Sequence, residues 1–144
     1  MIKIHALLIS IIFICNISYS QNIVGKIYSN ADANTLFGPV TVSVQISSSQ
    51  LNSLTSQTTN YLMFRILNGN LTILGDKRMV LYPTNVAISP QDVFRYFSIS
   101  LIQKLLTDGN NATTSIEVRN NGIITLTNGI HTLENGVECP PYCW

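Results

Sequence analysis

Charged side chains are scarce in this 144-residue chain, which has eight lysines and arginines and seven aspartates and glutamates. One of the basic residues, Lys3, lies within the first twenty positions, so the rest of the chain has seven charges of each sign. A near-neutral chain with scattered charges lacks the basic surface that attracts nucleic acid or an anionic membrane. The composition therefore predicts neither kind of partner.

Histidine and catalytic motifs are also nearly absent. His131 is the single histidine after the first twenty residues, and the chain has no Gly-x-Ser-x-Gly, His-Glu-x-x-His or phosphate-binding loop. Two thiolates and one imidazole are too few ligands for an ordinary metal site. The sequence thus predicts no metal and no cofactor, and an enzyme that uses His131 is the weaker interpretation.

Long apolar runs are missing beyond the N-terminus. Residues 1–20 combine a short basic start, an apolar run over 6–14, and small residues at Ser18 and Ser20, which predicts a signal peptide cleaved after Ser20. That run is shorter than the roughly 20 apolar residues of a membrane-spanning helix. We therefore expect an exported protein, periplasmic or extracellular, with no transmembrane segment in the mature chain.

Of the three cysteines, only Cys139 and Cys143 lie beyond residue 20. In an exported protein, this pair predicts a structural disulfide that closes a small loop. The spacing differs from the Cys-x-x-Cys of redox proteins, whose first thiol opens a helix, so a thiol-active role is less favoured. The third cysteine, Cys15, is a poor lipid-anchor site because Ile14 stands where a small residue is required.

The predicted disulfide would constrain a C-terminal tail over residues 139–144. This tail carries Pro140, Pro141, Tyr142 and Trp144, which would form a rigid aromatic knob. The knob either packs against an end of the fold or contacts a partner, and Tyr and Trp are common at binding hot spots. We treat it as the candidate binding surface.

The strongest helical pattern covers residues 90–107. Ser89-Pro90-Gln91-Asp92 has the chemistry of a helix start, and Gly109 is placed to end the helix in a left-handed conformation. Apolar residues recur between them at spacings of three and four, namely Val93, Phe94, Phe97, Leu101, Ile102 and Leu105. A second, shorter helix is predicted over about 48–57.

Two segments have the alternation and turns of β-hairpins. Residues 40–46 alternate valine or isoleucine with polar residues, which predicts a strand with its aliphatic side chains inward. Asn68-Gly69 predicts a two-residue turn that pairs Ile66 with Leu71 and Phe64 with Ile73. The same register leaves Arg65 and Thr72 on the solvent side.

A second hairpin is predicted around residues 120–122. A three-residue loop with a left-handed Gly122 pairs Val118 with Ile124 and Ile116 with Leu126. The following Asn128-Gly129 turn places His131 either opposite Leu126 or beside Thr125, depending on loop length. Thr125, Thr127 and Thr132 could form a hydroxyl row suited to sugar or ice, although a solvated sheet face is the more common arrangement.

Together these elements predict an α+β fold. We expect an antiparallel sheet of two β-meanders packed against the long helix over about 90–107, within a single domain over residues 21–138. The two halves echo each other as helix followed by meander, although Asn-Gly hairpins also arise independently in antiparallel sheets. For function, the sequence favours an exported non-enzymatic domain that binds a protein or cell-surface partner. A thiol-active or hydrolytic enzyme and an exported inhibitor are the alternatives.

Overall fold

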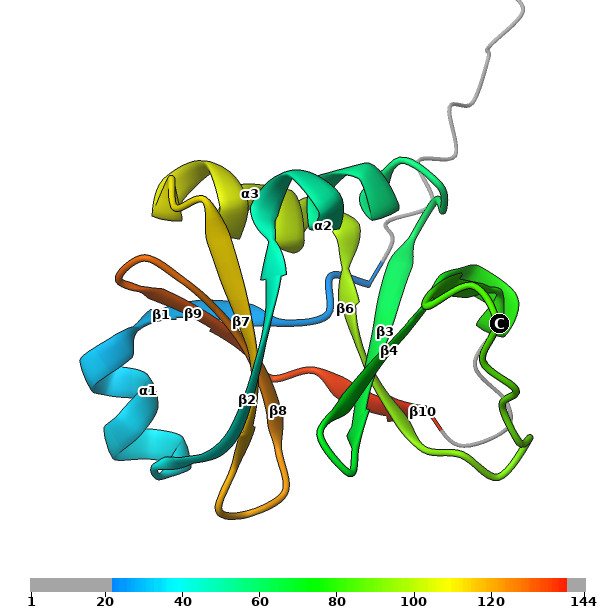
Figure 1. The fold of residues 1–144 in the computed structure, drawn as a ribbon. Helices are drawn as coiled ribbons and strands as arrows, with labels where there is room; N and C mark the ends of the chain where they lie inside the picture. Colours follow the sequence, from blue (N-terminus) through cyan, green and yellow to red (C-terminus); the bar gives the residue numbers. More distant parts are fainter. Residues whose placement is uncertain (1–21, 140–144) are drawn as a thin grey trace, which may run out of the picture.

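The computed structural model describes residues 22–139 as an α+β fold with two five-stranded antiparallel sheets (Figure 1). The first sheet has the order β1-β9-β8-β7-β2, formed by Lys26–Ser29, His131–Glu134, Ile124–Asn128, Thr113–Arg119 and Val40–Ser47. The second has the order β10-β6-β3-β4-β5, formed by Val137–Cys139, Phe94–Ser98, Tyr61–Leu67, Asn70–Leu74 and Val80–Tyr82. The α+β prediction is confirmed, but the expected single sheet is two sheets.

Three α-helices accompany the sheets: α1 (Asn30–Phe37), α2 (Ser48–Thr55) and α3 (Ile99–Gly109). Helices α2 and α3 lie together at one end of both sheets, whereas α1 lies beside the first sheet (Figure 1). The short helix predicted near 48–57 is therefore present as α2. No helix of the described chain is long and apolar enough to span a membrane.

The chain repeats one order of elements. The segment β2-α2-β3-β4-β5 is followed by β6-α3-β7-β8-β9, so each half is a strand, a helix and a three-stranded meander. The leading strands are exchanged, because β2 pairs with β7 of the second half and β6 pairs with β3 of the first. Both predicted meanders exist, and each belongs to a different sheet.

The main core lies between the two sheets and beneath α2 and α3. It contains Phe64, Phe97 and Leu126, and it receives Leu51 and Leu54 from α2 with Ile102 and Leu105 from α3. A smaller cluster of Met63, Leu74, Phe94 and Cys139 covers the other face of the second sheet. Apolar residues on both faces of this sheet explain why residues 62–64 of β3 and 71–74 of β4 are buried without alternation.

Both predicted hairpin registers are confirmed. Ile66 pairs with Leu71 and Phe64 with Ile73 around the left-handed Asn68-Gly69 turn. Val118 pairs with Ile124 and Ile116 with Leu126 around a loop in which Gly122 has φ of 79°. Thr72 was expected in solvent but is buried, because the face that it shares with Arg65 lies under the second apolar cluster.

The long helix predicted over 90–107 is wrong in its first half. Residues Phe94–Ser98 form β6, and the helix begins only at Ile99. Asp92 N–H donates to Ser89 O, and the Asp92 carboxylate accepts from Ser89 N–H, so residues 89–92 form a closed turn. The aromatic residues that follow fit an extended strand. Phe94 and Phe97 face opposite sides of it, which gave the misleading helical spacing.

Other local differences concern α1, the end of α3 and the exposure of β2. Helix α1 was not predicted, although Ser29 Oγ caps it by accepting from Asp32 N–H at 3.1 Å. Asn110, with φ of 46°, takes the left-handed position expected of Gly109. In β2, Val40 and Val42 were expected inside but are 39% and 40% exposed, because β2 is an edge strand.

Candidate functional site

Two separate hollows touch the boundary between the two sheets, one on each side of the β3–β4 hairpin. The larger hollow has a volume of about 310 Å³ and lies between β2 and β4, with Val44, Leu71, Tyr82 and Val86 among its lining residues. The smaller hollow, of about 190 Å³, lies on the β3 side and touches both sheets. We call these two hollows the inter-sheet groove.

The strand β2 borders the larger hollow and has a free edge in the described chain, where it pairs only with β7. Arg119 N–H donates toward β8, so the neighbouring Val118 directs its backbone groups toward β2 and pairs with Val42. By the same alternation, the backbone groups of Ser43 and Gln45 point away from β7. The edge therefore offers unpaired N–H and C=O groups.

The side chains of β2 do not protect this edge. No charged residue occurs between Val40 and Ser47, and Val42 stands half-exposed on the face that Val44 presents to the groove. One device that keeps natural edge strands from pairing with a further strand is a charged side chain that points toward the covered face, and β2 has none. Pro39 and a register shift between Val40 and Val42 interrupt only the first part of β2.

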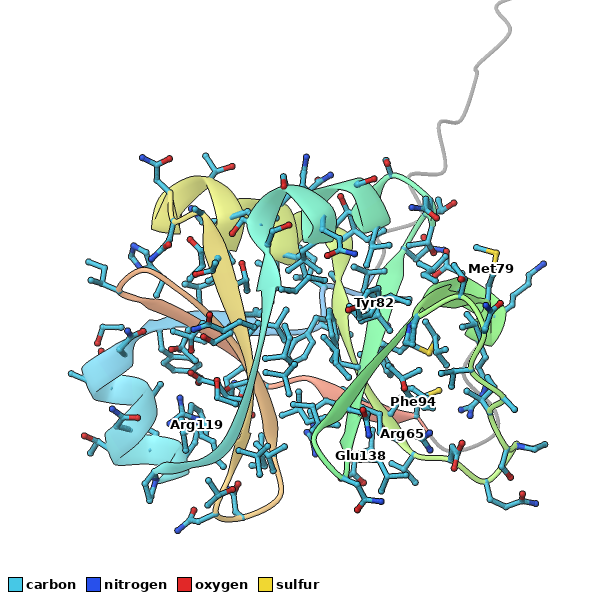
Figure 2. The ribbon with its side chains drawn as sticks, in the orientation of Figure 1. Arg65, Met79, Tyr82, Phe94, Arg119 and Glu138 are labelled. Atoms are coloured by element: carbon cyan, nitrogen blue, oxygen red, sulfur yellow. The ribbon has the colours of Figure 1, made fainter. Side chains whose placement is uncertain are left out.

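The rim of the smaller hollow is charged but balanced. Arg65 forms an ion pair with Asp92 at 2.6 Å, and Arg95 forms one with Glu138 at 2.9 Å. Arg65 also lies 4.9 Å from the centre of the Phe94 ring; Figure 2 shows Arg65, Phe94 and Glu138 at this end of the second sheet. Because each cation has a carboxylate partner, the rim favours ligands by shape more than by charge.

Asp92 is held ionised at this rim. The hydrogen bond from Ser89 N–H is the main cause that lowers its pKa; burial opposes it, and the Arg65 and Arg78 guanidinium groups lower the pKa further. Arg78 donates to the carbonyl oxygens of Ser89 and Asp92, both at 3.0 Å. These contacts hold residues 89–92 against the Arg78 side chain, which lies 5.1 Å from the centre of the Phe94 ring.

The predicted terminal site is only partly described. Cys139 ends β10, is completely buried, and packs in the cluster with Met63 and Phe94. Its predicted partner Cys143, and the tail residues Pro140, Pro141, Tyr142 and Trp144, lie outside the described residues. The disulfide and the binding tail therefore stay predictions.

His131 occupies neither of its expected positions. The turn consists of Gly129 and Ile130, so His131 pairs with Asn128 on one side and Ser29 on the other. Asn128 stays in the strand because its buried side-chain amide donates to Ser48 Oγ at 2.9 Å and to other neighbours. Within residues 22–139, no three histidine, cysteine or acidic side chains form a metal-binding group.

The predicted threonine row exists, but it is not a solvated face. Thr125 and Thr132 are completely buried, and Thr127 is partly buried. They share the outer face of the first sheet with Glu117 and Arg119, whose burial the sequence did not indicate. The free edge of β2 was not predicted either. The one sequence feature that could have indicated it is the alternation of aliphatic and uncharged polar residues over 40–46.

The fold and the groove describe an α+β domain with an open, uncharged sheet edge beside an apolar hollow. No protein-family model, curated protein or solved structure matches the chain.

Proposed function

We propose that the protein is an exported, non-enzymatic binding domain that takes up an extended segment of a protein partner along β2. The single observation that carries the proposal is the unpaired, uncharged edge of β2 beside a hollow of about 310 Å³. Strand addition is a recurrent mode of peptide recognition, in which main-chain hydrogen bonds give affinity and pockets for alternate side chains give specificity.

The geometry favours a partner segment with alternating apolar side chains. Ser43 and Gln45 present their N–H and C=O groups to an added strand. Every second side chain of that strand would then face the same way as Val42 and Val44, toward the groove. The polar side chains between them would face solvent on the side of Ser43.

The proposal can be tested by selecting binders from a displayed library of short random peptides. We expect the recovered peptides to share an alternating apolar pattern, and bound peptide to slow hydrogen exchange of the Ser43 and Gln45 amides. Recovery of peptides that protect another surface instead would contradict the assignment, as would a failure to select any peptide.

Two neighbouring substitutions give a matched comparison. Val42→Lys places a charge on the groove face and should abolish peptide binding, whereas Ser43→Lys adds the same charge on the opposite face and should leave binding largely intact. Neither residue belongs to the main buried cluster, so both variants should fold. Equal loss of binding in the two variants would contradict a groove-facing ligand.

A further inference from the structure

A second, polar cavity lies on the outer face of the first sheet, away from the inter-sheet groove. Its volume is about 140 Å³, and its lining includes Glu117, Arg119, Thr127 and Thr132 of the sheet with Asn30 and Asn34 of α1. At about 30 Å³ for each water in the liquid, the volume corresponds to roughly four or five waters. The cavity is thus suited to a small molecule and not to a chain segment.

Arg119 is the unusual member of this cavity, because its side chain is only 2% exposed. Its Nη1 donates to Asn34 Oδ1 at 2.8 Å and to Gly38 O at 2.7 Å. Its Nε is buried and has no partner within the described residues. A buried guanidinium N–H without an acceptor is costly. The nitrogen that can reach a ligand is Nη2, which makes no hydrogen bond within the described residues and is not enclosed as Nε is, so an oxygen inside the cavity can accept from it. Figure 2 shows Arg119 on the α1 side of the first sheet.

The hydroxyl groups of the cavity have already committed their protons. Thr127 Oγ1 donates to Glu117 Oε2 at 2.9 Å, and Thr132 Oγ1 donates to Asn30 Oδ1 at 2.8 Å. The two hydroxyl oxygens also lie 3.0 Å apart, so each uses at most one further site on the other. Each hydroxyl has one proton and two lone pairs, so both oxygens remain able to accept. The cavity therefore offers a donor at Arg119 and acceptors at the threonines. A ligand hydroxyl, which both donates and accepts, satisfies the two kinds of group.

Charge further restricts the ligand. Arg119 Nη2 lies 3.6 Å from Glu117 Oε2, so one positive and one negative group stand side by side. The two charges largely offset each other, so neither an anionic nor a cationic ligand gains a net attraction in this cavity. Taking size, hydroxyl complementarity and charge together, we propose that this cavity binds one neutral sugar unit, either a free monosaccharide or the terminal residue of a glycan.

The test is an NMR titration of the ¹⁵N-labelled protein with glucose, galactose, mannose and N-acetylglucosamine, and with glucuronic acid and glucosamine as charged analogues. We expect at least one neutral sugar to shift the amide signals of Glu117, Arg119, Thr127 and Thr132. The charged analogues should bind about tenfold more weakly than the neutral sugar, which is the size of effect expected when one polar contact to the ligand is lost. Methyl glycosides separate the two sources, since a site for terminal glycan residues accepts them and a site for free reducing sugars does not.

Two threonine variants supply the control. Thr127 and Thr125 both donate to Glu117 Oε2, but only Thr127 lines the cavity. Thr127→Val should therefore weaken sugar binding about tenfold. Thr125→Val also removes one hydrogen bond to the Glu117 carboxylate, but it should leave sugar binding unchanged. Equal weakening by both variants would overturn the proposal, and so would the absence of shifts at this face with every neutral sugar or equal binding of the charged analogues. The same spectra show whether each variant is folded.

Discussion

Replacing Arg119 with methionine should destabilise the protein substantially, because the guanidinium connects α1 to the first sheet. It is 2% exposed and donates to two oxygens of the α1 end, Asn34 Oδ1 and Gly38 O, at 2.8 and 2.7 Å. Hydrogen bonds of a charged group contribute about 1.5–3 kcal/mol each. Breaking a fully buried ion pair costs about 3–5 kcal/mol, but methionine keeps the apolar volume and Glu117 is 13% exposed. We therefore expect a loss of about 3 kcal/mol.

Urea unfolding followed by circular dichroism measures this loss as a lower midpoint at unchanged slope. Glu117→Gln, alone and combined with Arg119→Met, completes a double-mutant cycle, and the contact of 3.6 Å predicts a coupling of about 1 kcal/mol. Hydrogen exchange should quicken first in α1. A loss below about 1 kcal/mol in Arg119→Met would refute the reasoning, since a surface arginine costs no more than that.

Three further predictions concern other parts of the fold. Gly109→Ala should cost about 2 kcal/mol in urea unfolding, because its Cβ would lie 2.5 Å from the Asn128 carbonyl oxygen; an unchanged midpoint would contradict that close approach. Burial is the main cause that raises the pKa of Glu134, whose Oε1 has no partner among the described residues. The folded protein therefore holds this proton more tightly than the unfolded chain, and stability should fall as pH rises through the raised pKa. In Glu134→Gln, the free energy of unfolding should depend less on pH over this range. Parallel pH profiles of stability for the variant and the native protein would contradict the role given to Glu134. Finally, native protein with the predicted Cys139–Cys143 disulfide should show no reactive thiol, and two alkylated cysteines would exclude it.

Features encoded by neighbouring residues were predictable. The Asn68-Gly69 turn and the loop at Gly122 specified their registers, because a left-handed glycine and the alternation of aliphatic residues restrict the pairing to one solution. The failure over 90–107 has the opposite origin. Apolar residues at spacings of three and four fit a helix, but here Phe94 and Phe97 serve two different clusters on opposite faces of a strand. The local pattern cannot show that a second apolar cluster exists.

The candidate sites depend on contacts between distant residues, which the sequence could not show. The sequence gives no reason to expect that Arg119 is buried, because its acceptor Asn34 belongs to α1, far away in the chain. The free edge of β2 becomes evident only when its single partner is known to be β7.

The exchange of leading strands between the two halves has a consequence for folding. Neither half can complete its own sheet, since β2 finds its partner in β7 and β6 finds its partner in β3. Strand β1 has the most distant partner along the chain, because Lys26 pairs with Glu134 of β9. Contacts so distant must close large loops before they contribute stability, which slows folding. The first sheet therefore cannot be completed until β7 to β9 have been made, and two separate halves would regain both sheets only by complementing each other.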